Sequence, residues 1–235
     1  MKKVAVLILV CSLVVGICAV AGAQELSFQE LADKVEEKLK SIEDARLVLE
    51  FDMVQMGQKT RTVMGIKGSK EHKLTRIEIL APDIAAGQIM LLDMENSEMR
   101  MYMPALNQII VQSLAASAAG YGINIDLDDL TQSLSLEGLA GEIIEVVETE
   151  AGLEYVVAVA VTDEQVPVLV MQGIEVDPKD LVQHIWIDAQ FIPYKLESFQ
   201  DGTSLGSLVL SEYEINVGME TDELREMPDV PLLQF

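Results

Sequence analysis

The chain has 235 residues, of which 39 are Asp or Glu and 16 are Lys or Arg, so its net charge is -23. Half of the residues are hydrophobic and only 5% are aromatic, which is enough apolar content for a domain-sized core and excludes a disordered chain. A charge this negative repels phosphate backbones and anionic headgroups, which argues against nucleic acid and lipid headgroups as electrostatic partners. A charged partner is expected to be basic.

Residues 1–23 have the pattern of a secretory signal peptide. A basic start precedes an apolar stretch, and the small residues Ala21-Gly22-Ala23 end the segment. This predicts cleavage before Gln24 and a mature chain of one domain, residues 24–235. An uncleaved anchor is the alternative, because the apolar stretch is about long enough to cross a bilayer.

The two cysteines, Cys11 and Cys18, both lie within this leader. Neither follows the small residue that bacterial lipidation requires, so we expect a protein that is soluble in the periplasm or another exported envelope space. A mature chain without cysteine has no disulfide, no thiol nucleophile and no Cys-based zinc site.

A helix is expected first, over residues 28–43. Ser27 and Glu30 have the spacing of a capping box. Apolar residues then recur at helical spacing on one face, at Phe28, Leu31, Val35, Leu39 and Ile42.

From Leu47 the apolar period changes from 3.6 to 2, which indicates a strand with one buried face over 47–54. Ten further short strands are expected, separated by turn signals, at 59–67, 73–80, 88–93, 97–103, 107–112, 142–148, 153–161, 182–189, 193–201 and 205–216. About eleven strands with short connections predict a mainly β (α+β) domain, an antiparallel meander curled into a barrel or half-barrel.

Two segments interrupt the strands. Residues 113–141 are rich in alanine and glycine and contain a candidate acidic helix at 126–134, which suggests a loop or lid. Residues 162–181 form an irregular insertion, with a helical turn expected near 178–182.

Residues 202–206 match the G-x-S-x-G pattern of hydrolases, with Ser204 in the nucleophile position. They follow Asp201 in an expected hairpin, no helix follows, and only His72 and His184 could act as a base. We therefore expect a flexible hairpin and no enzyme.

Metal sites and cofactors are not expected either. The two histidines have no partner at ligand spacing. Asp126, Asp128 and Asp129 lack the glycine-bearing loop and terminal Glu of a calcium site, and Asp residues are favourable at a helix N-terminus.

Methionine is concentrated in one part of the chain. Eight of the 12 methionines are Met53, Met56, Met64, Met90, Met94, Met99, Met101 and Met103. Core packing would explain this, but flexible thioether side chains also suit a cavity for acyl chains of varied shape.

The order of these features resembles the LolA-like family of periplasmic lipoprotein carriers, which includes the outer-membrane lipoprotein-sorting proteins. The segments that carry the resemblance span most of the mature chain: 76–82, 87–93, 101–104, 109–111, 185–188, 192–196 and 213–216.

The resemblance implies an incomplete antiparallel barrel whose apolar concave face is covered by an N-terminal helix and a lid. It implies a periplasmic carrier that shields the acyl chains of lipoproteins and passes them to the outer membrane, without covalent chemistry. An inner-membrane transporter and an outer-membrane acceptor, with basic docking surfaces, are the implied partners. A carrier of free lipids or glycolipids, and an RseB-like module that senses lipoproteins and regulates a protein partner, are the alternatives.

Strand alternation suggests which residues would line the ligand-binding face, although a one-residue error in register would invert any strand. The expected lining is Leu49, Phe51, Met53, Met64, Met90, Leu92, Met99 and Met101 on strands and Leu114 on the lid. The family closes its lid with an arginine, and the matching region here offers Lys67 or Lys70 instead, each a point charge without the planar fork of arginine.

Overall fold

The computed structural model describes residues 26–55, 58–114, 126–161 and 181–234. The expected signal peptide and its cleavage site therefore lie outside the described residues, as do most of the expected lid loop and of the 162–181 insertion. Leu181, expected at the end of this insertion near a helical turn, instead begins a strand, one residue before the expected strand start at Val182.

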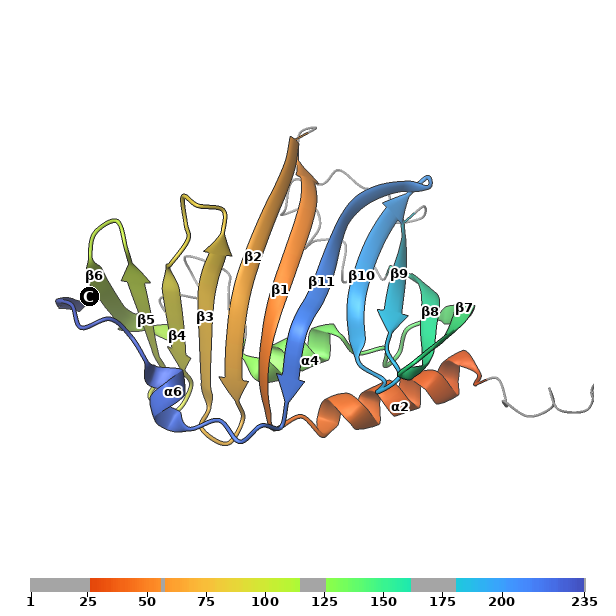
Figure 1. Cartoon of the computed structure of the whole chain (residues 1–235), viewed down its shortest axis with the longest axis horizontal. Coiled ribbons are helices and arrows are strands. Elements are labelled where there is room, and N and C mark those ends of the chain that lie inside the picture. Colours follow the sequence, from red (N-terminus) through yellow and green to blue (C-terminus); the bar gives the residue numbers. More distant parts are fainter. Residues whose placement is uncertain (1–25, 56–57, 115–125, 162–180, 235) are drawn as a thin grey trace, which may run out of the picture.

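The chain forms one twelve-stranded sheet with three helices among the described residues (Figure 1). Across the sheet the strand order is β12-β6-β5-β4-β3-β2-β1-β11-β10-β9-β8-β7. The strands of the first half are β1 (Asp44–Gln55), β2 (Gln58–Ser69), β3 (Leu74–Ala81), β4 (Ile89–Asp93), β5 (Glu98–Met103) and β6 (Gln108–Ser113). Those of the second half are β7 (Gly141–Thr149), β8 (Gly152–Ala160), β9 (Leu181–Ile187), β10 (Pro193–Gln200), β11 (Thr203–Ile215) and β12 (Leu232–Gln234).

The mainly β fold and all eleven expected strands are confirmed, and neighbouring strands in this set pair antiparallel. The twelfth strand, β12, was not expected. It is three residues long and pairs in parallel with β6, so the sheet is not antiparallel throughout. Three residues that follow Pro231 are too few to show a period of two, which explains the omission.

Helix α2 (Phe28–Lys40) begins as its sequence indicates. The Ser27 hydroxyl accepts the backbone N–H of Glu30 at 3.2 Å, and the Glu30 carboxylate accepts the N–H of Ser27 at 2.9 Å. The helix ends at Lys40, three residues earlier than expected, yet Ile42 is still buried. One face of α2 is thereby fixed against the sheet.

Helix α4 (Leu127–Ser133) is the short acidic helix expected within the lid segment. Its N-cap is Asp126, whose carboxylate accepts the backbone N–H of Asp129 at 2.8 Å. Burial and the neighbouring Asp126 charge raise the pKa of the Asp129 carboxyl. These aspartates therefore start a helix, which buries Leu127 and Leu130.

The C-terminal segment crosses the sheet on the side opposite α4 (Figure 1). The Asp44 carboxylate accepts the backbone N–H groups of Val217 and Gly218, and helix α6 (Thr221–Arg225) follows. Leu224 of α6 is fully buried against a small cluster that consists of Leu74, Leu91, Met219 and the partly buried Met227. The outer face of β3 and β4 is thus covered by the end of the chain.

Candidate functional site

The strand register places the eight expected lining residues of the strands on one face of the sheet. Leu49 pairs with Met64, Met90 with Met101, and Leu92 with Met99. Because paired residues project to the same side and alternate residues along a strand share a face, these positions form one surface, to which Phe51 and Met53 also belong. We call this surface the inner face. The expected lining residues on it, which belong to strands between β1 and β5, are Leu49, Phe51, Met53, Met64, Met90, Leu92, Met99 and Met101.

Helices α2 and α4 cover part of the inner face and form the main core with it. Leu49, Leu47 and Ile66 are buried there against the apolar side of α2 and against Leu127 and Leu130 of α4. The helical residues of α2 in this cluster are Leu31, Ala32, Val35 and Leu39. Figure 1 shows both helices lying along the end of the sheet where β1 begins.

A second cluster lies farther along the sheet and is rich in methionine. Leu92, Met99 and Leu114 are buried in it, and three partly buried methionines pack against them, namely Met90, Met94 and Met101. Leu114, the expected lid residue, therefore shares a cluster with strand residues of β4 and β5.

Exposure changes along the inner face in the same sense on each strand. Leu49, Ile66, Leu92 and Met99 are buried. On each of these strands, the next inward-facing residue, farther from the end of the sheet where β1 begins, is half-buried. We call these half-buried residues the inner band; they are Phe51, Met53, Met64, Met90 and Met101. The inner band is an apolar surface continuous with the core, against which Met64 and Met90 pack.

The inner face extends into strands for which no lining residue was expected. Phe51 pairs with Leu208 of β11, and Leu208 pairs with Leu196 of β10, so both leucines join the same surface. Alternation within the expected strands 193–201 and 205–216 indicates which of their residues share a face. Because the sequence does not give the order of strands, it could not show that this face continues the inner face of the methionine-rich half.

The two lysines expected near the lid make different contacts. The Nζ atom of Lys70 lies 3.0 Å from the Asp128 carboxylate of α4, whereas that of Lys67 lies 2.8 Å from the Glu223 carboxylate of α6. The hydrogen bond from Lys67 is the main cause that lowers the pKa of the Glu223 carboxyl. Lys67 thus contacts the C-terminal helix on the outer face, and Lys70 is the one that contacts the expected lid segment.

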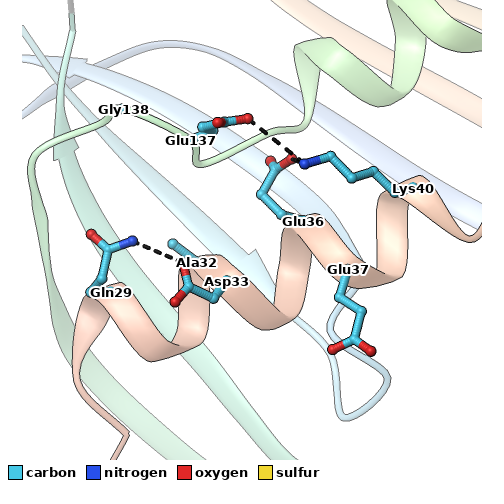
Figure 2. Close-up of a pocket in the computed structure, with 8 residues that line it drawn as sticks. All are labelled: Gln29, Ala32, Asp33, Glu36, Glu37, Lys40, Glu137 and Gly138. Atoms are coloured by element: carbon cyan, nitrogen blue, oxygen red, sulfur yellow. Dashed lines mark hydrogen bonds and ion pairs between the residues drawn. The ribbon is translucent and has the colours of Figure 1, made fainter.

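Helix α2 is joined to the segment after α4 by polar contacts around a groove of about 380 Å³ (Figure 2). The hydroxyl of Ser135 donates to the Glu36 carboxylate, and Lys40 lies 3.5 Å from Glu36 and 4.0 Å from Glu137. The Lys40 and Glu137 side chains are more than 70% exposed, so water screens the pair and its strength is low.

The G-x-S-x-G segment has a structural explanation at each of its three defining positions. Gly202, in the β10–β11 turn, has φ +73°, and a Cβ on Gly206 would lie 2.7 Å from the carbonyl oxygen of Asp52 on β1. Ser204 donates its hydroxyl to the Glu197 carboxylate at 2.8 Å, not to a histidine. The expected hairpin is confirmed, and the segment contains no strand-to-helix turn.

The two histidines lie in unrelated places. The His184 ring is half-buried between aromatic rings, 4.8 Å from Phe199 and 6.1 Å from Trp186 between centroids. His72 contacts the carbonyl oxygen of Met219 through Nε2 at 3.1 Å. The described part of the chain contains no group of three or more His, Cys, Asp or Glu side chains that could hold a metal ion.

The structure therefore defines an open, curved and mainly antiparallel sheet whose apolar inner face is partly covered by two helices. No helix within the described ranges has the length and apolar content needed to cross a membrane.

This architecture occurs in solved structures. An uncharacterized conserved protein from Thermus thermophilus is similar with a TM-score of 0.51 and 14% identity, over 88% of this chain and 98% of that one. Lipoprotein LppX from Mycobacterium tuberculosis is similar with a TM-score of 0.47 and 10% identity, over 81% and 100%. A LolA superfamily protein from Nitrosomonas europaea is similar with a TM-score of 0.35 and 13% identity, over 87% and 96%. No family model and no curated protein matches the sequence.

Proposed function

We propose that this protein is an exported carrier that binds the acyl chains of lipoproteins on its inner face and passes them to the outer membrane. The observation that carries the proposal is the inner band, a half-buried apolar surface that is continuous with the methionine cluster and borders the covering helices. The sequence resemblance to the LolA-like carriers supports the same function.

Burial of hydrocarbon would supply the affinity. Each methylene removed from water contributes about 0.8 kcal/mol, so an acyl chain of a dozen or more methylenes gains on the order of 10 kcal/mol before the cost of ordering it. Methionine side chains adapt to chains of different shape because they are unbranched and polarizable. The four methionines Met53, Met64, Met90 and Met101 place such side chains along the inner band.

Loading also requires that the covering helices, α2 and α4, move away from part of the inner face. The covering helices bury Leu49 and its neighbours, so longer or additional acyl chains must displace part of them. Among the polar contacts of the cover, Lys70–Asp128 joins α4 to the sheet, whereas Lys40–Glu137 and Ser135–Glu36 join α2 to the segment after α4. The two ion pairs involve partly or largely exposed side chains, and such pairs typically contribute about 1 kcal/mol or less each. The cover is therefore held chiefly by apolar contacts that an acyl chain can replace.

The experiment is a titration of residues 24–235 with a synthetic triacylated lipopeptide, read by native mass spectrometry, beside the same peptide without acyl chains. We expect a complex with the lipopeptide and none with the bare peptide. The double variant Met64→Gln/Met101→Gln should weaken binding at least tenfold. Val63→Gln/Tyr102→Gln is the matched control, because these neighbours on the same two strands face the opposite side.

Equal binding by the inner-face variant and the control, with both variants folded by circular dichroism, would disprove the proposed site. Mass spectrometry of protein purified from its own envelope without detergent identifies the cargo class. A lipoprotein adduct supports the proposal, whereas free phospholipid or glycolipid favours the lipid-carrier alternative.

A further inference from the structure

The two ends of the sheet differ in how their edges are protected. At one end β12 covers β6 and is only three residues long. At the other end β7 has nine residues, and no described strand pairs with its far side. A long unpaired edge presents a row of free backbone N–H and C=O groups, to which another extended chain can add.

The β7–β8 hairpin is also unusually apolar for an exposed edge. Ile144 is 45% exposed, Val146 47%, Val147 39% and Leu153 of β8 37%. They project from both faces of the hairpin, since Val146 pairs with the inward-facing Tyr155 and Val147 with its neighbour Glu154. Apolar side chains at such positions give a docked strand surface to bury on either side.

Acidic residues lie between these apolar ones, at every third position of β7. Glu142, Glu145 and Glu148 are exposed on β7, and Glu150 follows in the turn. None of the cations in the described ranges forms an ion pair with these four carboxylates. Their charge is therefore available to a partner.

We propose that the β7 edge is a docking site for an extended, basic segment of a partner protein, which adds as a strand with lysine or arginine near the glutamates and apolar residues on the valines. A second copy of this chain is the disfavoured occupant. Edge-to-edge pairing of two β7 strands would gather six glutamates in one ribbon, between molecules that each carry a net charge of -23. The inference concerns a different surface from the inner face and does not depend on what that face binds.

The β-bulge on β7 limits the length of the docking edge. The register shifts between Ile143 and Glu145, so the longest uninterrupted stretch of the ladder with β8 is 145–149. A docked segment therefore pairs chiefly with these five residues, which is long enough for a short strand.

The test uses a nine-residue peptide that repeats Lys-Val-Val, to match the spacing of the glutamates on β7, with blocked ends, titrated into residues 24–235 by isothermal calorimetry at low and physiological salt. We expect saturable one-to-one binding that weakens as salt rises. A peptide of the same charge with proline at its central valines should bind at least tenfold more weakly, because proline cannot donate to the ladder. Equal binding of the two peptides would overturn strand addition.

Variants locate the surface. Glu142→Gln/Glu145→Gln/Glu148→Gln should weaken binding at least tenfold, and a control with the same charge change, Glu71→Gln/Glu95→Gln/Asp229→Asn, should retain more of it, because those exposed residues lie elsewhere. Equal losses in the two triple variants would overturn the proposed location. Sedimentation of the unmodified chain as a dimer that Val147→Lys dissociates would overturn the choice of occupant.

Discussion

The Nζ atom of Lys70 lies 3.0 Å from Oδ1 of Asp128, and this ion pair joins the β2–β3 turn to helix α4. The Lys70 side chain is 22% exposed and that of Asp128 is 71% exposed. Beside the pair, Leu127 packs so closely on Gly68 that a Cβ there would lie 3.2 Å from the leucine Cβ. An apolar contact therefore seats α4 on the sheet, and the ion pair restrains it from the solvent side.

Loss of this ion pair is expected to loosen α4 without unfolding the domain. Lys70→Gln should lower the free energy of unfolding by about 1 kcal/mol or less, as for other solvent-exposed pairs, while hydrogen exchange of the α4 amides becomes several-fold faster. Asp128→Asn should give the same result, and the double variant should add little to either. Hydrogen-exchange mass spectrometry makes the measurement, with Lys59→Gln, at the far end of β2, as the control. Unchanged exchange in α4 would show that apolar contacts alone hold it.

Asp93 is a buried carboxylate on the outer face that links β4 to α6. Its side chain is 3% exposed and lies 2.7 Å from Nη2 of Arg225. It also accepts the backbone N–H of Asn96 at 3.0 Å and its side-chain amide at 2.9 Å. Burial raises the pKa of Asp93, but the hydrogen bonds from Asn96 and Arg225 outweigh burial and hold the pKa below its ordinary value.

The stability that Asp93 contributes should therefore depend on pH. A carboxyl whose pKa is lower in the folded state stabilises it fully above the unfolded pKa of about 3.9 and loses that contribution as the pH falls through the folded pKa. Asp93→Asn is expected to reduce the free energy of unfolding by about 1 to 3 kcal/mol at pH 7, with a smaller difference below about pH 4. Urea unfolding at several pH values measures this, with Glu95→Gln in the same turn as the control. A pH-independent difference would contradict the assignment.

The G-x-S-x-G segment gives a third prediction, in which a glycine matters more than the serine. A Cβ on Gly206 would meet the carbonyl oxygen of Asp52 at 2.7 Å, so Gly206→Ala must move β11 away from β1 and should cost about 1 to 3 kcal/mol. Ser204 is exposed and makes one hydrogen bond, so Ser204→Ala should cost about 1 kcal/mol or less. Thermal unfolding compares them. The reverse order would mean that Ser204 has a role beyond the hairpin.

The strands were predictable because their pattern is local. Alternation of Leu47, Leu49, Phe51 and Met53 indicates a strand with one apolar face whatever its neighbours are. The same alternation grouped the methionines of β5 on one side, and the register agrees with that grouping. Local patterns therefore predicted eleven strands and grouped the expected lining residues of the strands on one face of the sheet.

Contacts between distant segments were not predictable in this way. Lys67 and Lys70 are three residues apart, yet one contacts Glu223, 156 residues later, and the other contacts Asp128. Which lysine meets α4 depends on where β2 ends and on where α6 lies, and neither follows from spacing. The short strand β12 and the position of β7 at the other end of the described sheet likewise follow only from the order of strands.

The last prediction concerns Leu224, which fastens the C-terminal segment to the sheet. Helix α6 has five residues, too few for a stable helix on its own. Leu224 is fully buried against Leu74 and Leu91, so Leu224→Ala should lower the free energy of unfolding by about 2 to 5 kcal/mol. Asp222→Ala, an exposed position on the same helix, is the matched control and should change it by about 0.5 kcal/mol or less.

Urea denaturation measures the stability of both variants, and hydrogen exchange over 219–227 shows whether α6 detaches before the sheet unfolds. Arg225, the residue after Leu224, forms an ion pair with Asp93 at the end of β4. Faster exchange in α6 should therefore be accompanied by faster exchange at the end of β4. If α6 exchanged rapidly in Leu224→Ala while the free energy of unfolding and the hydrogen exchange of β4 were unchanged, the C-terminal segment would not contribute to the stability of the domain. The cluster beneath it would then not be part of the core.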